Sequence, residues 1–153
     1  MKASLYHLQL NVSNPQRSMP FYQALLEYLE YRVLAAAHDF MGLSNGTADV
    51  WIIATPDQHR QPGLHRKRSG LNHLAFGVAS RDAVDVFHRE FLVARGIPTL
   101  YGPPRDYPAY AAGYYAVFFE DPDRLKLEVA HVPGRTGQGT PRSGARRRAS
   151  RGS

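Results

Sequence analysis

The alternation of apolar and polar residues divides the chain into two similar halves. The stretch "LYHLQLNV", residues 5–12, has the period of two that is typical of a β-strand, and "LNHLAFGV", residues 71–78, repeats it. A helical pattern follows each stretch, with Asn14 and Ser80 as expected N-caps and Gly96 just past the end of the second helix. Pro20 predicts that the first helix either starts near Ser18 or kinks.

Short strand patterns complete both halves. The first half continues with expected strands at 31–40, 40–44 and 48–55, with a turn at Asn45-Gly46. The second continues with an edge strand at 98–104 and a hairpin, 113–120 and 125–132, around the turn "DPDR". This duplicated β-α-β-β-β order predicts an α+β fold of two modules, 1–55 and 71–132, which form one domain and are joined by a basic linker, 56–70.

Strand parity places three chemically active side chains on corresponding faces of the two predicted sheets. The mostly apolar face of each first strand should lie under its own helix, so His7 and His73 should point to the other side. In the last strand, Leu127 and Val129 take the helix side and Glu128 faces away. If the two sheets curve toward each other, these three side chains can converge.

Two imidazoles and one carboxylate form the 2-His-1-carboxylate pattern of a divalent-metal site with open positions. Fe²⁺, Mn²⁺, Ni²⁺, Co²⁺ or Zn²⁺ could occupy it. The alternative is that His7, His73 and Glu128 are ordinary polar residues on a hydrated sheet face. Their placement by an internal repeat favours the metal site.

The same parity predicts a small-molecule cleft with apolar walls and a few polar groups. A tyrosine-rich and proline-rich loop, residues 101–115, either packs onto the sheet or acts as a lid, and its arginine would suit a carboxylate or phosphonate. The predicted cleft residues are Gln9, Asn11, Trp51, Ile53, Thr55, Arg105, Tyr107, Tyr110, Tyr114, Phe118 and Lys126.

The composition excludes some kinds of chemistry and indicates where in the cell the protein is expected. There is no cysteine, which excludes disulfides and thiol chemistry. No apolar run is long enough for a signal peptide or a membrane span, so we expect a cytoplasmic protein.

The net charge of +6 comes from residues 133–153, which contain six arginines and no acidic residue. The rest of the chain carries 13 basic and 13 acidic residues. We expect this tail to be disordered and solvated, with contact to nucleic acid as the alternative.

Three segments resemble the vicinal oxygen chelate superfamily, which includes glyoxalase I, bleomycin-resistance proteins, fosfomycin-resistance proteins and extradiol dioxygenases. They are "YHLQLNVSNPQRSMPFYQALL", "GLNHLAFGVASRDAVD" and "GYYAVFFEDPDRLKLEV", and the likeness spans about residues 3–132. The third segment is most similar to a bacterial branch of the superfamily whose substrates are unassigned. The resemblance implies paired βαβββ modules whose curved mixed sheets enclose a metal-binding cleft, with His7, His73 and Glu128 as ligands.

The resemblance also implies a homodimer and a substrate that chelates the metal through neighbouring oxygens, in lyase, transferase or dioxygenase chemistry. Overlaying the halves puts Ile53 where bacterial-type glyoxalase I has a fourth ligand, so that activity is disfavoured. Arg124 occupies a turn position where the superfamily commonly has Gly, and we interpret it as tolerated. The alternative function is a metal-free protein that binds a small or drug-like molecule, as bleomycin-resistance proteins do.

Overall fold

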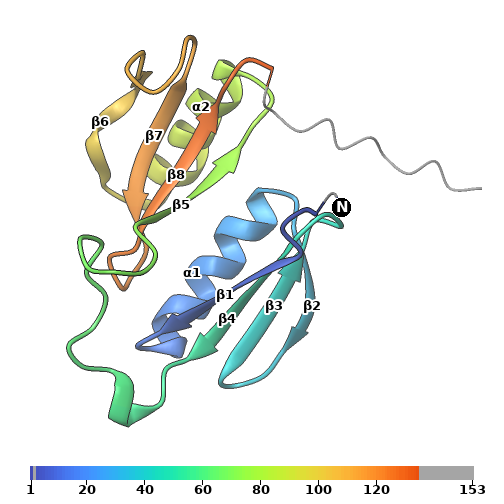
Figure 1. The fold of residues 1–153 in the computed structure, drawn as a ribbon, viewed down its shortest axis with the longest axis vertical. Coiled ribbons are helices and arrows are strands. Elements are labelled where there is room, and N and C mark those ends of the chain that lie inside the picture. Colours follow the sequence, from blue (N-terminus) through green and yellow to red (C-terminus); the bar gives the residue numbers. More distant parts are fainter. Residues whose placement is uncertain (2, 135–153) are drawn as a thin grey trace, which may run out of the picture.

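The computed structural model describes residues 1 and 3–134 and confirms an α+β fold built from two four-stranded mixed sheets. The predicted tail lies almost wholly outside the described residues. Figure 1 shows the two modules stacked along the long axis of the molecule, each with its helix against one face of its sheet. Among the described residues, no helix combines the length and apolar character that a membrane crossing requires.

The two modules have the same topology. The first consists of β1 (His7–Val12), α1 (Pro15–Tyr28), β2 (Arg32–Ala36), β3 (Phe40–Ser44) and β4 (Asp49–Ala54). The second consists of β5 (His73–Gly77), α2 (Arg81–Phe87), β6 (Thr99–Asp106), β7 (Tyr115–Glu120) and β8 (Lys126–His131). The sheet orders are β1-β4-β3-β2 and β5-β8-β7-β6, with the first and last strand of each module paired in parallel. The duplication predicted from the sequence is therefore present in three dimensions.

Local signals set the helix boundaries. The Asn14 side chain accepts a hydrogen bond from the Arg17 backbone N–H, and Ser80 accepts one from Ala83, as expected of N-caps. Helix α1 begins at Pro15 and contains Pro20, so Pro20 does not mark its start. The second helix continues beyond α2 as a π-helical turn, η2 (His88–Leu92), and a 3₁₀ turn, η3 (Val93–Arg95), before left-handed Gly96 ends it.

The segment predicted as a loop at 101–115 is partly strand. Residues 101–106 belong to β6, which pairs with β7 across an irregular register between Leu100 and Arg105, and only 107–114 connect the two strands. The expected edge strand at 98–104 is therefore confirmed and extends two residues further, to Asp106, because an edge strand tolerates prolines, which have no N–H donor. The connection between the modules, 56–70, contains one short 3₁₀ turn, η1 (Asp57–His59).

The helix sides of both modules share one hydrophobic core. Tyr28 of α1 contacts the rings of Phe87 and Phe91, with centroids 5.8 and 5.3 Å away, and Tyr31 contacts Phe76 of β5. One cluster contains buried side chains of both helices and both sheets. The open face of each sheet is therefore directed away from this core.

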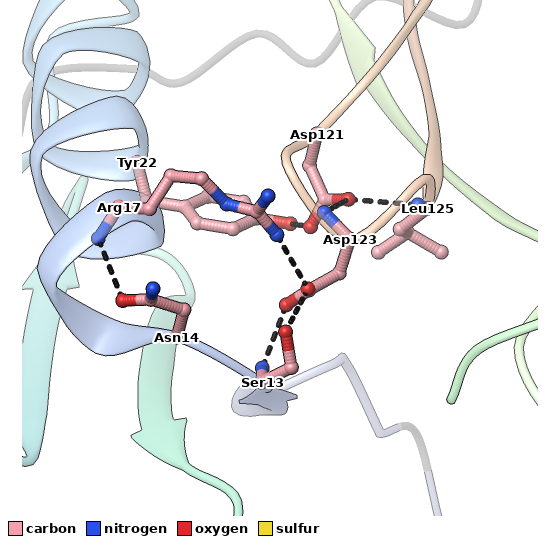
Figure 2. Close-up of polar contacts among 7 residues, drawn as sticks. All are labelled: Ser13, Asn14, Arg17, Tyr22, Asp121, Asp123 and Leu125. Carbon is pink, nitrogen blue, oxygen red and sulfur yellow. Dashed lines mark hydrogen bonds and ion pairs between the residues drawn. The ribbon is translucent and has the colours of Figure 1, made fainter. Parts of the chain in front are cut away.

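Two carboxylates of the β7–β8 turn connect the second module to the first (Figure 2). Asp121 accepts a hydrogen bond from the Tyr22 hydroxyl at 2.6 Å and from the backbone N–H groups of Asp123 and Leu125 at 2.9 and 2.7 Å. Asp123 accepts from the Ser13 N–H at 2.8 Å and from the Ser13 hydroxyl, and it pairs with Arg17 at 3.1 Å. We call this set of contacts the inter-module clamp.

Burial makes the clamp sensitive to loss of a partner. Tyr22 is fully buried and Asp121 is 6 % exposed. Desolvation raises the pKa of both groups, and the proximity of Asp121 raises the pKa of the Tyr22 hydroxyl further. The carboxylate therefore depends on its three donors to offset the cost of burial.

We predict that Tyr22→Phe lowers the free energy of unfolding by about 1–3 kcal/mol, because it leaves a buried carboxylate oxygen without its donor. Urea denaturation measures the change. Tyr6→Phe is the matched control, since Tyr6 is exposed and should tolerate the same loss of a hydroxyl. Equal midpoints for the two variants would contradict a stabilising role for the clamp.

Candidate functional site

The candidate site lies on the open face of the second sheet, which is the face directed away from the shared core. Glu128 lies in the middle of β8, between β5 and β7, and is 1 % exposed, whereas His73 begins β5 at the sheet edge. The His73 Nε2 atom lies 3.4 Å from Glu128 Oε2. The Tyr114 hydroxyl donates a hydrogen bond to the other carboxylate oxygen, Oε1, at 2.6 Å. The structure thus brings two of the three predicted metal ligands together.

A further chain of hydrogen bonds orients the His73 ring. The Asn72 side-chain amide donates through Nδ2 to the Arg66 carbonyl at 2.9 Å, which leaves its Oδ1 atom facing His73 Nδ1, also at 2.9 Å. In the neutral tautomer that fits an acceptor at this position, Nδ1 carries the proton and Nε2 carries a lone pair. Asn72 is not among the predicted site residues, because strand parity places it on the helix side, whereas β5 begins only at the next residue.

Aromatic side chains form the wall beside the Glu128 carboxylate. Tyr107 contacts Phe118 edge to face at 5.2 Å and stacks on Tyr110 at 5.6 Å, and Tyr110 contacts Tyr114 at 5.4 Å. A separate buried cluster of Ala116, Phe118 and Ala130, with Tyr107 and Tyr114 packed against it, underlies this wall. These side chains form an apolar layer on the open side of the second sheet.

Two cations border the aromatic wall. Lys126 begins β8, and its Nζ atom lies 5.3 Å from the centre of the Phe118 ring. Arg105 of β6 donates a hydrogen bond through Nε to the Tyr107 hydroxyl at 3.2 Å and lies 5.1 Å from the centre of that ring. Arg105 is thus held against the wall by Tyr107.

The remaining predicted residues belong to the first module. His7 is exposed at the start of β1, on the open side of its sheet, together with Gln9 and Asn11. Half-buried Trp51 and Ile53 of β4 lie on the same side, and Thr55 follows that strand. Within residues 1 and 3–134 of a single chain, no group of three His, Asp or Glu side chains is arranged to hold a metal ion. One chain therefore pairs His73 with Glu128 but does not bring His7 to them.

Strand pairing corrects the overlay of the two modules. His7 pairs with Asp49 and Gln9 with Trp51, whereas His73 pairs with Lys126 and Ala75 with Glu128. The first-module equivalent of Glu128 is therefore Trp51 rather than Ile53. The overlay was wrong by two residues because an even shift preserves strand parity and leaves no trace in the hydrophobic pattern.

The correction leaves no acidic residue at the fourth position. The Trp51 indole lies over Gly42 of β3, and a Cβ atom built at Gly42 would come within 2.5 Å of the ring. The glycine allows this large side chain to lie flat on the open face of the first sheet. An indole cannot supply the carboxylate that the fourth position would require.

Comparison with known proteins agrees with the family resemblance of the three sequence segments. Residues 4–129 match the profile of the "Glyoxalase/Bleomycin resistance protein/Dioxygenase superfamily". The chain is 35% identical over 127 residues to the uncharacterized protein YqjT of Bacillus subtilis (strain 168), which covers 82% of this chain and 96% of YqjT.

Solved structures show the same fold. A candidate glyoxalase from Bacillus halodurans is 36% identical, with a TM-score of 0.76 over 84% of this chain and 95% of that one. The fosfomycin resistance protein FosX of Listeria monocytogenes is 18% identical, with a TM-score of 0.62 over 86% of this chain and 95% of that one, and supports the fold alone. From the duplicated modules and these matches together, the chain belongs to the glyoxalase/bleomycin resistance protein/dioxygenase superfamily.

Proposed function

We propose that the protein is a divalent-metal-dependent enzyme that acts on a small substrate able to chelate the metal through neighbouring oxygen atoms. The observation that carries this proposal is the facing pair of His73 Nε2 and Glu128 Oε2, 3.4 Å apart. Asn72 directs the imidazole proton to the far side of the ring, so two electron-rich atoms face each other. Such a pair is favourable only with a cation or a proton shared between them.

The donor set fits a first-row divalent metal. A neutral imidazole nitrogen and a carboxylate suit Fe²⁺, Mn²⁺, Co²⁺, Ni²⁺ and Zn²⁺ alike. Asn72 and Tyr114 supply the outer hydrogen bonds that metal-binding histidines and carboxylates commonly need. Two ligands from one chain form only part of such a site.

We infer that His7 of a second copy of the chain completes it. Edge strands β1 and β5 begin with the two repeated histidines, and the open faces of both sheets are directed away from the shared core. A homodimer that sets β1 of one copy beside β5 of the other would place the partner's His7 next to His73 and Glu128. The same pairing would turn the two open sheet faces into the walls of one cleft.

Within that cleft the described side chains have separate tasks. A bound metal would act as a Lewis acid on the substrate oxygens. The rings of Tyr107, Tyr110 and Phe118 would exclude water, and Lys126 and Arg105 would orient an acidic group of the substrate. This arrangement is compatible with lyase, transferase and dioxygenase chemistry.

The aromatic wall favours one other function, a metal-free protein that sequesters an aromatic or drug-like molecule. Four rings, those of Tyr107, Tyr110, Tyr114 and Phe118, form a connected surface without help from a metal. Binding of such a molecule would survive a chelator. Metal analysis therefore distinguishes the two functions directly.

We predict that untagged protein loaded with Co²⁺ or Mn²⁺ and passed over a desalting column retains about one ion per chain. His73→Ala and Glu128→Ala should each abolish retention, because each removes a ligand. Elemental analysis gives the stoichiometry, and His88→Ala on the helical segment is a matched histidine control. Equal metal content in all four proteins, or no retention by the wild type, would overturn the metal site.

We predict that Asn72→Ala weakens metal affinity by roughly 10–100-fold, because His73 loses the acceptor that orients its proton. Asn72→Asp, which keeps an acceptor oxygen, should restore most of the affinity. Competition with a chelating dye measures both variants. If Asn72→Asp is as weak as Asn72→Ala, the hydrogen bond to His73 is not the reason for the loss.

We predict that His7→Ala and Glu128→Ala chains complement each other when they are unfolded and refolded together. In a mixed dimer, one of the two shared sites would receive an intact His7 from one chain and an intact His73 and Glu128 from the other. Random assembly should restore about one quarter of wild-type metal binding. If all three ligands came from one chain, no mixed dimer would contain an intact site.

The matched control is a mixture of His73→Ala and Glu128→Ala chains. Both substitutions lie in the second module, so every site in every dimer stays defective. Metal binding in the first mixture but not in the second supports a site shared between two copies. Recovery in neither mixture would refute it.

A further inference from the structure

Two hollows lie where the two modules meet, away from the His73–Glu128 pair. The larger has a volume of about 710 Å³ and is bounded by β1, the linker and the β7–β8 turn. The smaller, about 180 Å³, lies between the linker and the same turn. Leu64 and Arg124 line both hollows, and neither His73 nor Glu128 lines either of them.

The smaller hollow carries an excess of positive charge. Arg66, Lys67 and Arg124 line it, and Glu120 is the only carboxylate among its lining residues. Glu120 is shared, since Arg66 pairs with one of its oxygens and Arg124 Nε lies 3.6 Å from the other. One carboxylate against three cations leaves two positive charges, which matches the charge of a phosphate monoester near neutral pH.

The larger hollow offers room and apolar surface beside these cations. Its volume falls within the range of small-molecule sites. Leu64, Leu71 and Leu10 contribute apolar surface. Asn11 and Thr55, which the sequence predicted for the metal cleft, contribute polar groups here, and so do the clamp carboxylates Asp121 and Asp123. A ligand with its acidic group in the smaller hollow could extend its body into the larger one past Leu64.

The backbone at Arg124 supplies an independent reason to assign a role to this side chain. Its φ angle is 68°, in the left-handed region that glycine adopts without strain. The turn requires this conformation, because Arg124 N–H donates to the Asp121 carbonyl at 3.0 Å while Asp121 N–H donates to the Leu125 carbonyl at 3.0 Å. Glu30 and Tyr101 also have positive φ, but neither lines these hollows. The strained position therefore directs a guanidinium to the boundary between the two hollows.

We propose that these hollows bind a small organic phosphate, whose phosphoryl group contacts Arg124, Arg66 and Lys67 while its apolar body lies in the larger hollow. Arginine forms paired hydrogen bonds to phosphate oxygens, and Arg124 keeps 77% of its side chain exposed to meet them. Neither hollow is lined by His7, His73 or Glu128, so binding here does not depend on the ligands of the proposed metal site.

Isothermal titration calorimetry at constant ionic strength, with phenyl phosphate and inorganic phosphate as probes, tests the proposal. Phenyl phosphate should bind more tightly than inorganic phosphate, because only its ring reaches the larger hollow. Arg124→Gly should weaken phenyl phosphate binding by roughly tenfold to a hundredfold through lost charge-assisted hydrogen bonds. Its unfolding temperature should equal or exceed that of the wild type, since glycine relieves the backbone strain.

Two control variants complete the experiment. Arg89→Gln removes one positive charge from an exposed residue of the helical segment that pairs with Glu90, and it should change affinity by less than roughly twofold because solvent screens distant charges. Glu128→Ala should bind phenyl phosphate as the wild type does. Equal losses in Arg124→Gly and Arg89→Gln, or phenyl phosphate binding no tighter than inorganic phosphate, would overturn the proposal.

Discussion

The arrangement of the two modules depends on the hydrogen bonds that the buried Asp121 carboxylate accepts. A carboxylate that is 6 % exposed needs donors for both of its oxygens, and these come from its own turn and from the Tyr22 hydroxyl of the other module. The β7–β8 turn is thereby held against α1. Since the helix sides of both modules share one core, the orientation of each open sheet face follows from this contact and from the packing beneath it.

The orientation of the open sheet faces explains why His7 lies apart from His73 and Glu128 within one chain. His73 and Glu128 lie on adjacent strands of one sheet, so local pairing is sufficient to bring them together. His7 occupies the corresponding position in the other sheet, and among residues 1 and 3–134 no third His, Asp or Glu side chain joins His73 and Glu128. A shared core within one chain and a cleft shared between two copies are compatible, because the core uses the helix sides of the sheets and the cleft would use their open sides.

The β7–β8 turn would serve both the fold and the second binding site. Asp121 and Asp123 point to α1 and to the end of β1, whereas Arg124 reaches the hollows beside the linker. The same turn geometry that places the two acids for the clamp requires a left-handed residue at Arg124. The left-handed backbone at this position is therefore a consequence of the clamp, whereas the arginine side chain is not required by it, and the proposed phosphate site would use that side chain.

The sequence by itself determined the two modules, the helix caps and the face on which each candidate ligand lies. These features depend on local periodicity and on capping residues such as Asn14 and Ser80, which act within a few positions along the chain. Tertiary structure decided the rest. Strand register moved the equivalent of Glu128 from Ile53 to Trp51, because parity is blind to a shift of two residues. The separation of His7 from Glu128 depends on how distant segments pack, and no local pattern encodes that packing. The hydrogen bond that Asn72 accepts from His73 joins neighbouring residues, but it forms because β5 begins at His73 and leaves Asn72 outside the strand.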